Sequence, residues 1–373
     1  MDKLSLVDIK KKNYSDIYHF IYKHGKISKQ SLAQGLQISL PTVNQHLNAL
    51  MENGLIEQCG QLQSQIGRRA NVYSAVSQAR TAIGVEILKD QTTVVMIDLF
   101  GNVVNSRRFP FIYENSDGYC RQVGQCILEF IDASEIPHSK ILGIGFGMQG
   151  LASSDGTQMT YSKILDTEGL TSQAFEQHVG LPCRLMHDSE CAAVTTLWNS
   201  PEIQDSIYLS LAYHLGGAII IHGEIQQGLT GKSGTIEHMT LIPNGRKCYC
   251  GQLGCAECYC SVDALLNNEE DLDSFFQKKN AGSTEHMKRW KKYLDYLAIL
   301  VNNLHLVIEC SIILGGHLAP YMQEEDFQYL HETIQKHTAF PEKESFLLQS
   351  SRYPNSVSIG AALKLVKSFL AHV

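Results

Sequence analysis

The hydrophobic positions of the first fifty residues follow three helical patterns separated by short polar turns. The patterns predict helices over residues 5–24, 29–34 and 40–52. Ser28 and Ser39 stand where N-caps are expected, and residues 35–38 form the turn between the second and third helices. A helix, a short helix, a tight turn and a third helix are the layout of a helix-turn-helix.

The third of these helices has an apolar face and a polar face. Val43, Leu47 and Leu50 lie on the apolar face. The polar side chains of this helix are of the kinds that hydrogen-bond base edges, and residues at the start of the helix are also candidates for DNA contacts. The candidate DNA contacts are Ser39, Pro41, Thr42, Asn44, Gln45 and His46. Because this helix contains no Lys or Arg, its phosphate contacts must come from elsewhere.

Two strand-like segments, residues 55–59 and 71–76, flank a loop that contains Arg68 and Arg69. This is the pattern of a winged helix-turn-helix, and arginines on a wing suit the narrow minor groove. Residues 1–80 carry ten Lys and Arg against five Asp and Glu, whereas the remainder carries 21 against 33. This asymmetry indicates that only the N-terminus meets nucleic acid. The alternative is a three-helix interaction module with a solvated polar face.

Beyond residue 80 the pattern alternates between strands and helices. Strands are expected at residues 82–88, 92–98, 103–109, 141–146, 183–186, 207–212, 217–222 and 312–314. Helices are expected at residues 117–133, 191–198, 261–266, 272–278, 285–308 and 358–370. This alternation implies an α/β fold with ligands at the carboxyl ends of strands. A chain of 373 residues predicts two or three domains.

The cysteines and the hydropathy indicate a cytoplasmic protein. No run approaches the roughly 18 apolar residues of a membrane span, and the N-terminus lacks a secretory apolar region. Of the eleven cysteines, five lie between Cys248 and Cys260. An odd total with such a cluster is typical of a cytosolic metal site and not of a disulfide framework.

The segment from residue 237 to 257 carries the most specific chemistry. It contains His238, then Cys248 and Cys250, and then Cys255 after two glycines. One imidazole and three thiolates form a common closed, structural ligand set for zinc, and the glycines let the loop fold back. The prediction is one structural Zn²⁺ per chain, held by these four residues. The alternative is a cluster of buried free thiols.

Asp188 follows a buried strand and precedes a helix. A carboxylate in this place can accept a proton from a bound hydroxyl. It can equally cap the helix that follows, and the sequence alone leaves both roles open.

Taken together, these motifs resemble the ROK family, which contains sugar-responsive bacterial repressors and sugar kinases. The family pattern is Gly-Glu-x-Gly-His followed by Cys-x-Cys-Gly-x-x-Gly-Cys-x-Glu, and this chain reads Gly-Thr-Ile-Glu-His from residue 234 and then matches from Cys248 to Glu257. The resemblance covers nearly the whole chain. It implies an α/β, two-lobed actin-like ATPase domain with a zinc knuckle, preceded by a winged helix-turn-helix.

The resemblance also implies where the domains divide. Residues 1–78 would form the winged helix-turn-helix found in the regulators, and residues 79–373 the sugar-binding domain. Within the latter, the small lobe would take residues 81–190 and the C-terminal helix 358–373. The large lobe would take residues 191–357, and the sugar would bind between the lobes.

The resemblance carries a sugar site onto this chain residue by residue. His238 matches a histidine that binds both zinc and sugar, Glu257 matches a ligand of sugar hydroxyls, and Asp188 matches the kinase general base, which survives in the regulators as a sugar ligand. His187 stands where the family has a sugar-binding Asn, and Thr235 where it has Glu, so both are also expected at the sugar. In the turn before the pocket, Gln149 replaces Pro. The site is therefore recognisable but altered, which leaves the identity of the sugar open.

The first strand hairpin separates kinase from regulator. Kinases of the family have Asp-x-Gly-Gly-Thr there, whose backbone N–H groups hold ATP phosphates. Residues 86–90 read Glu-Ile-Leu-Lys-Asp, without glycine. A second loop, residues 214–217, is glycine-rich in the kinases but reads His-Leu-Gly-Gly here. Phosphoryl transfer depends on positioning the phosphates. The sequence therefore predicts no enzyme activity.

The expected protein is a cytoplasmic, zinc-containing repressor of carbohydrate genes that acts as a homodimer or tetramer. Its expected partners are double-stranded operator DNA and a sugar or sugar-derivative effector, with no membrane contact. The alternatives are a regulator controlled by a protein partner and a sugar kinase with a DNA-binding appendage. Nothing in the sequence decides whether the protein represses or activates transcription.

Overall fold

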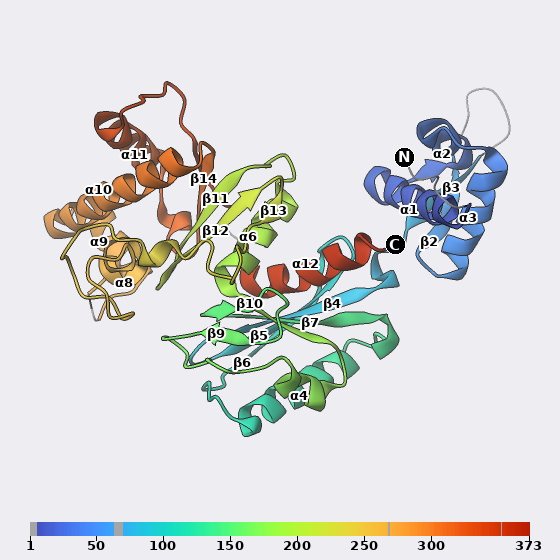
Figure 1. Cartoon of the computed structure of the whole chain (residues 1–373), viewed down its shortest axis with the longest axis horizontal. Helices are drawn as coiled ribbons and strands as arrows, with labels where there is room; N and C mark the ends of the chain where they lie inside the picture. Colours follow the sequence, from blue (N-terminus) through green and yellow to red (C-terminus); the bar gives the residue numbers. More distant parts are fainter. Residues whose placement is uncertain (1–5, 63–69, 268, 352) are drawn as a thin grey trace.

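The computed structural model describes residues 6–62, 70–267, 269–351 and 353–373. Its N-terminal part, blue in Figure 1, is a three-helix unit with a small antiparallel sheet. The elements are α1 (Leu6–His24), β1 (Ile27–Ser28), α2 (Lys29–Leu36), α3 (Leu40–Glu52), β2 (Ile56–Leu62) and β3 (Ala70–Ala75). The strand order β1-β3-β2 places the β2–β3 hairpin where a winged helix-turn-helix has its wing.

Serine caps start α2 and α3 as the sequence predicts. The hydroxyls of Ser28 and Ser39 accept hydrogen bonds from the backbone N–H three residues on, at 3.2 and 3.3 Å. Gly35 was expected in the turn but lies inside α2. A side chain there would meet Phe20 Cζ at 2.5 Å, so this glycine allows α2 to pack closely on α1 and does not end the helix.

Two five-stranded sheets make up the rest of the molecule. The first has the order β10-β7-β4-β5-β6. Its strands are β4 (Thr81–Ile87), β5 (Thr92–Asp98), β6 (Val103–Phe109), β7 (Ile141–Met148) and β10 (Cys183–His187). The second has the order β13-β12-β11-β14-β15. Its strands are β11 (Ser206–Leu211), β12 (Leu215–Ile221), β13 (Glu224–Ile225), β14 (Ser311–Gly315) and β15 (Leu347–Gln349).

The two sheets share one topology. In each, the first three strands form an antiparallel meander, and the last two continue in parallel from the first strand. The amino-acid sequence contains no repeat that would indicate this. The structural duplication rests on the pattern of strands and not on residue identity.

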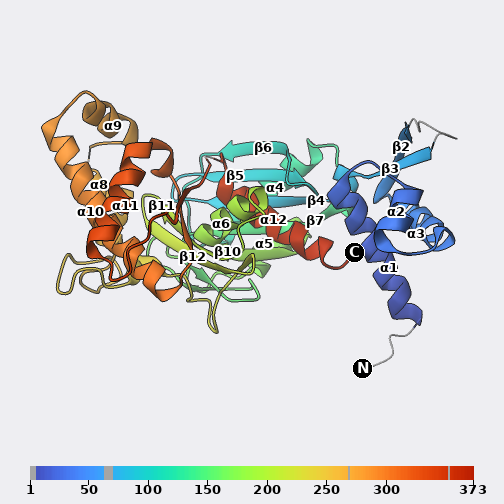
Figure 2. The ribbon, with the colours of Figure 1, turned by 90° about the horizontal axis from the view of Figure 1, so that it is seen from above.

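Helices cover both sheets, as Figures 1 and 2 show. Helix α12 (Ser356–Leu370) packs on one face of the first sheet and against α6 (Asp188–Asn199), while α4 (Asp117–Asp132) covers the other face together with α5 (Gln173–Val179). A side chain at Gly84 or Gly145 would collide with the α12 backbone, at 1.7 and 2.4 Å. These glycines let α12 lie directly on β4 and β7.

The second sheet has its own helical layer. This layer contains α8 (Val262–Leu265), α9 (Leu272–Asn280), α10 (Thr284–Val307) and α11 (Glu324–His337). The remaining short elements are η1 (Ser77–Ala79), η2 (His138–Lys140), β8 (Leu151–Ala152), β9 (Met159–Tyr161), η3 (Ile236–His238), α7 (Glu257–Cys260) and η4 (Ala319–Tyr321).

The N-terminal unit is joined to the first sheet by a shared apolar core. Ile17 and Ile21 of α1 belong to the same buried cluster as Leu363 and Val366 of α12. The ring of Tyr22 stacks on Phe100, with centroids 4.5 Å apart, and its hydroxyl donates to Leu99 O at 2.6 Å. The DNA-binding unit is therefore packed onto the first sheet.

The structure differs from the sequence prediction in several elements. Helix α11 was missed because few of its positions are apolar; it starts with a capping box between Gln323 and Asp326 and buries Leu330 and Ile334. Helix α6 begins three residues before the expected residue 191. The short strands β8, β9 and β15 have too few residues to show a periodicity.

Within the described part of the chain, no helix is long and apolar enough to cross a membrane.

Candidate metal centre and effector pocket

A loop between η3 and α7 brings three cysteines back toward the end of η3. Isolated bridges pair Lys247 with Leu253 and Thr240 with Cys255, so the chain reverses over a few residues. Gly254 has a φ of 81°, and a side chain there would lie 1.8 Å from Ile242 O. Only glycine fits at this close approach. The glycine spacing in the sequence therefore produces the knuckle.

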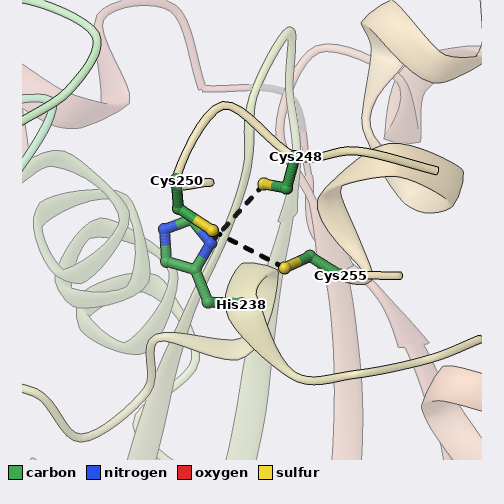
Figure 3. Close-up of side chains that lie close together, drawn as sticks. All are labelled: His238, Cys248, Cys250 and Cys255. Carbon is green, nitrogen blue, oxygen red and sulfur yellow. Dashed lines mark hydrogen bonds between the residues drawn. The ribbon is translucent and has the colours of Figure 1, made fainter. Parts of the chain in front are cut away.

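The four predicted ligands of the knuckle converge on one point, as Figure 3 shows. Their ligand atoms all lie within 4.8 Å of one another. Cys248 Sγ lies 3.9 Å from His238 Nδ1, and Cys250 Sγ lies 3.7 Å from Cys255 Sγ. Burial raises the pKa of the Cys248 and Cys255 thiols. A cation would favour their ionised form, and this donor set fits the tetrahedral chemistry of a divalent metal.

A cavity of about 50 Å³ lies beside the knuckle. One side comes from the segments after β7 and β10, and the other from β12, η3 and the knuckle. Of the five predicted sugar ligands, four line this cavity: His187, Asp188, Thr235 and His238. The volume is enough for only one or two water molecules. A monosaccharide therefore requires the two sides to separate.

Glu257, the fifth predicted sugar ligand, does not line the cavity. Its Oε1 is 2.8 Å from His214 Nδ1, and its Oε2 accepts a hydrogen bond from Leu215 N at 2.7 Å. His214 does line the cavity. Burial favours the neutral form of His214, but its hydrogen bond to Glu257 and that residue's charge outweigh burial and raise its pKa. Glu257 thus favours the protonated form of His214 at the pocket wall.

Asp188 is the first residue of α6, and the N-cap position belongs to His187. The Oδ1 of Asp188 accepts hydrogen bonds from Ser189 N at 2.7 Å and from Ser189 Oγ at 3.2 Å. His187 Nε2 lies 3.3 Å from the same oxygen. The N-terminus of a helix favours a negative charge, and this carboxylate lies at the start of α6 in the cavity wall.

Two further carboxyl groups lie near Asp188. Burial raises the pKa of Glu237 to about 7, and the charges of Asp188 and Glu257 add to the shift against an opposing effect of His187. Burial also raises the pKa of Glu86 to about 7, with the charge of Asp188 adding to it. Glu86 belongs to the hairpin that holds phosphates in kinases of the family. That hairpin therefore presents an acid where a nucleotide would need donors.

The third N-terminal helix presents most of its predicted DNA contacts to solvent. Ser39, Pro41, Asn44 and Gln45 are exposed, and Thr42 is half-buried. His46 differs, because it is only 7% exposed and packs edge-on against Tyr14 with centroids 6.1 Å apart. His46 is therefore corrected to a packing residue, out of reach of a base edge.

A cation missing from α3 itself is supplied by α2. Lys29 Nζ donates to Asn44 Oδ1 at 2.5 Å, so an ammonium lies beside the exposed face of α3. Sequence reasoning had found no source of phosphate contacts near this helix. Arg68 and Arg69 of the predicted wing lie outside the described residues.

The cavity residues that sequence reasoning missed include His214, Glu237 and Tyr249. Tyr249 stands between two cysteine ligands and Glu237 directly before His238, so their neighbours in the motif were the available signal. His214 directly precedes β12, and only the fold brings it to the pocket.

Comparison with known families and proteins agrees with this arrangement. The profile described as the ROK family matches residues 82–368, and the profile of a winged helix-turn-helix DNA-binding domain matches residues 15–57. The N-acetylglucosamine repressor of Escherichia coli O157:H7 is 29% identical over 255 residues. That match covers 67% of this chain but only 62% of the repressor. The xylose repressor of Bacillus subtilis (strain 168) is 27% identical over 279 residues, covering 72% of this chain and 70% of that protein.

Solved structures share the fold. A ROK family transcriptional regulator described as a homologue of E. coli MLC superposes with a TM-score of 0.80 at 19% identity, covering 98% of this chain and 97% of that one. A ROK hexokinase from Thermus thermophilus superposes with a TM-score of 0.65 at 19% identity, covering 78% and 99%. At these identities the likeness concerns the fold alone.

Proposed function

The chain belongs to the ROK family, and from this premise we propose that it is a DNA-binding transcriptional repressor of carbohydrate genes, controlled by a sugar or sugar derivative. The observation that carries the proposal is the cavity between the two sheets, which is lined by Asp188, His187 and the metal-cluster residue His238. The exposed polar face of α3 gives the same chain a surface for DNA. Two curated relatives are named N-acetylglucosamine repressor and xylose repressor.

The metal that the knuckle holds is Zn²⁺, in a structural role. Three thiolates and an imidazole fill a tetrahedron and leave no open position for catalysis. His238 belongs both to the cluster and to the cavity wall, so the metal fixes one wall of the pocket. Cys248, Cys250 and Cys255 supply the remaining ligands.

Helix α6 is the mechanical link in this proposal. It begins at Asp188 in the cavity, and near its other end Trp198 Nε1 donates to Phe100 O at 3.0 Å. The ring of Phe100 stacks on Tyr22 of α1. A shift of α6 that accompanies sugar entry would therefore reach the DNA-binding unit through packed side chains. The effector acts only through its different affinity for the two arrangements.

On DNA, a homodimer would place two α3 helices in successive major grooves of a roughly palindromic operator. The contacts proposed are Ser39, Pro41, Thr42, Asn44 and Gln45, with Lys29 on a phosphate. Arg68 and Arg69 remain proposed contacts of the wing. The protein acts in the cytoplasm, where its DNA lies.

We also propose that the chain is not an enzyme. Residues 86–90 lack glycine, and the raised pKa of Glu86 marks a buried acid at the place where a triphosphate would lie. Backbone N–H groups that approach a phosphate need glycines around them. ROK kinases share the fold, so this proposal rests on the hairpin and not on the architecture.

The experiment is a two-part assay on the full, zinc-loaded chain. Genomic DNA fragments are first selected by binding, and fluorescence anisotropy then measures their affinity with and without each sugar of a monosaccharide panel. A sugar that changes DNA affinity at least tenfold supports the proposal. An Asn44→Ala variant serves as control, and it should lower DNA affinity while leaving sugar-induced thermal shifts unchanged. Selection of no DNA would overturn it.

A second candidate is control by a protein partner, and the observation in its favour is the small volume of the cavity, about 50 Å³. The same assay separates the two. A blank sugar panel with intact DNA binding, together with release of DNA by a cell extract but not by its small-molecule filtrate, would select this second candidate.

A further inference from the structure

Glu237 carries an unpaired acceptor in the effector cavity. Its side chain is only 7% exposed, and it lines the cavity next to Thr235 and His238. The Oε2 atom makes no hydrogen bond to any residue that the structure describes. A buried acceptor without a donor is unfavourable, and native proteins rarely leave one unsatisfied. This oxygen is therefore placed to receive a donor that arrives with a ligand.

The neighbouring groups are already committed elsewhere. Thr235 Oγ1 donates to Lys232 O at 2.9 Å. His214 is paired with Glu257, and Ser189 Oγ donates to Asp188. None of these groups can turn to Glu237 without breaking a bond that it now makes. A donor that arrives with a ligand would satisfy Glu237 Oε2 without breaking any of these bonds.

The charge of the cavity selects the kind of donor. Two carboxyl side chains, Asp188 and Glu237, line it, and the basic groups among the described lining residues include Lys163 and His214. The charge that His214 gains is offset by its partner Glu257. The ammonium of Lys163 lies 5.8 Å from the centre of the Tyr161 ring, which gives this cation a partner of its own. Zinc with three thiolates would add a further net negative charge at the cavity wall. A cationic donor gains from this surrounding, whereas a phosphate is repelled.

We propose that Glu237 is a specificity-determining residue that selects a sugar with a free amino group, whose ammonium donates to Glu237 Oε2. This rests on the proposed function, because it assigns the sugar class to the same pocket. The charge-assisted bond discriminates against a neutral sugar that offers a hydroxyl in the same place. Asp188 remains a contact for the sugar hydroxyls.

Isothermal titration calorimetry on the full, zinc-loaded chain tests this. The probes are glucosamine, galactosamine and mannosamine, each with its neutral parent hexose and its N-acetyl derivative, together with glucosamine 6-phosphate. We expect at least one amino sugar to bind about tenfold or more tighter than its parent hexose, and the phosphate to bind more weakly than the amino sugar. In Glu237→Gln that preference should fall to about unity, while affinity for the parent hexose changes less than threefold. The control Glu224→Gln, on an exposed carboxylate paired with Lys367, should keep the preference.

The outcomes separate this proposal from the proposed function. Neutral or N-acetylated sugars binding as tightly as the amino sugars would overturn the role of Glu237 and leave the sugar sensor standing. Binding of no sugar at all would overturn both. If Glu237→Gln does not fold, the ratio of amino sugar to parent hexose in the unmodified protein decides, because a ratio near unity already contradicts the proposal.

Discussion

The knuckle and the β4–β5 hairpin lie beside the same carboxylate, Asp188, and they are built in opposite ways. The knuckle keeps the glycines that let its backbone fold back, and four donor atoms converge within 4.8 Å. Residues 86–90 of the hairpin lack glycine, and burial, with the charge of Asp188 adding to it, raises the pKa of Glu86 to about 7. We propose that one loop holds a cation and a sugar and that the other opposes an anion. This difference is our reason for expecting a sensor on a fold that ROK kinases share.

The largest effect is expected from breaking the knuckle. Cys250→Ser removes one thiolate from the zinc site, and structural zinc contributes folding free energy directly. We expect the unfolding free energy to fall by several kcal/mol, bound zinc to be lost and the response to sugar to disappear. Calorimetry with zinc quantification by mass spectrometry measures this. Cys126→Ser, on a half-buried cysteine in α4, is the matched control and should keep both zinc and stability.

A smaller effect with a defined pH dependence is expected from the hairpin. The pKa of Glu86 is raised from 4.5 to about 7, so the folded state binds a proton that the unfolded state has released between these values. The free-energy cost of ionising Glu86 in the folded state is absent below pH 4.5, grows as the pH rises, and is complete above pH 7. Glu86→Gln should therefore raise the unfolding free energy at pH 8 by up to about 3 kcal/mol and leave it unchanged near pH 4.5.

Urea unfolding at both pH values measures this, with the exposed Glu114→Gln as control. An equal gain at both pH values would mean that the charge of Glu86 is not the cause. No gain in unfolding free energy at pH 8 would show that Glu86 is well solvated. It would also remove the main reason to exclude phosphate binding at this hairpin.

The smallest effect concerns how the pocket is coupled to the DNA-binding unit. Trp198→Phe removes the donor to Phe100 O while keeping an aromatic ring at the end of α6. One lost hydrogen bond should cost about 1 kcal/mol of stability. The sugar should still bind with unchanged affinity, but its effect on DNA affinity should be reduced several-fold. If anisotropy shows full release of DNA by sugar in this variant, the signal does not pass through Trp198.

The two regions also differ in what the sequence could predict. The four knuckle residues fall within eighteen positions, so local glycine and cysteine spacing was enough to name them, and the structure brings all four together. The cavity depends on segments far apart in the chain, such as His214 just before β12 and Asp188 at the start of α6. Their proximity, and the carboxyl chemistry of Glu237, follow from tertiary packing that no spacing encodes.

The N-terminal unit shows the limit of polarity as a guide. His46 was expected on DNA because it is polar, but it stands three residues after Val43 and four before Leu50, on the buried face of α3. Its helical position was the better signal, since the period of a helix decides which side chains are covered. Asn44 and Gln45, off that face, are exposed as expected.

The most direct test measures, in one experiment, whether the pocket beside the knuckle binds a sugar and whether the β4–β5 hairpin binds Mg-ATP. The zinc-loaded chain is heated in a thermal-shift assay with glucosamine, with Mg-ATP and with both, and ADP is measured afterwards. A sugar at 100 times its Kd should stabilise the fold by about 2.7 kcal/mol. We expect this shift with glucosamine, no shift with Mg-ATP and no ADP. A shift with Mg-ATP, or ADP formed at enzymatic rates in the presence of the sugar, would contradict the account.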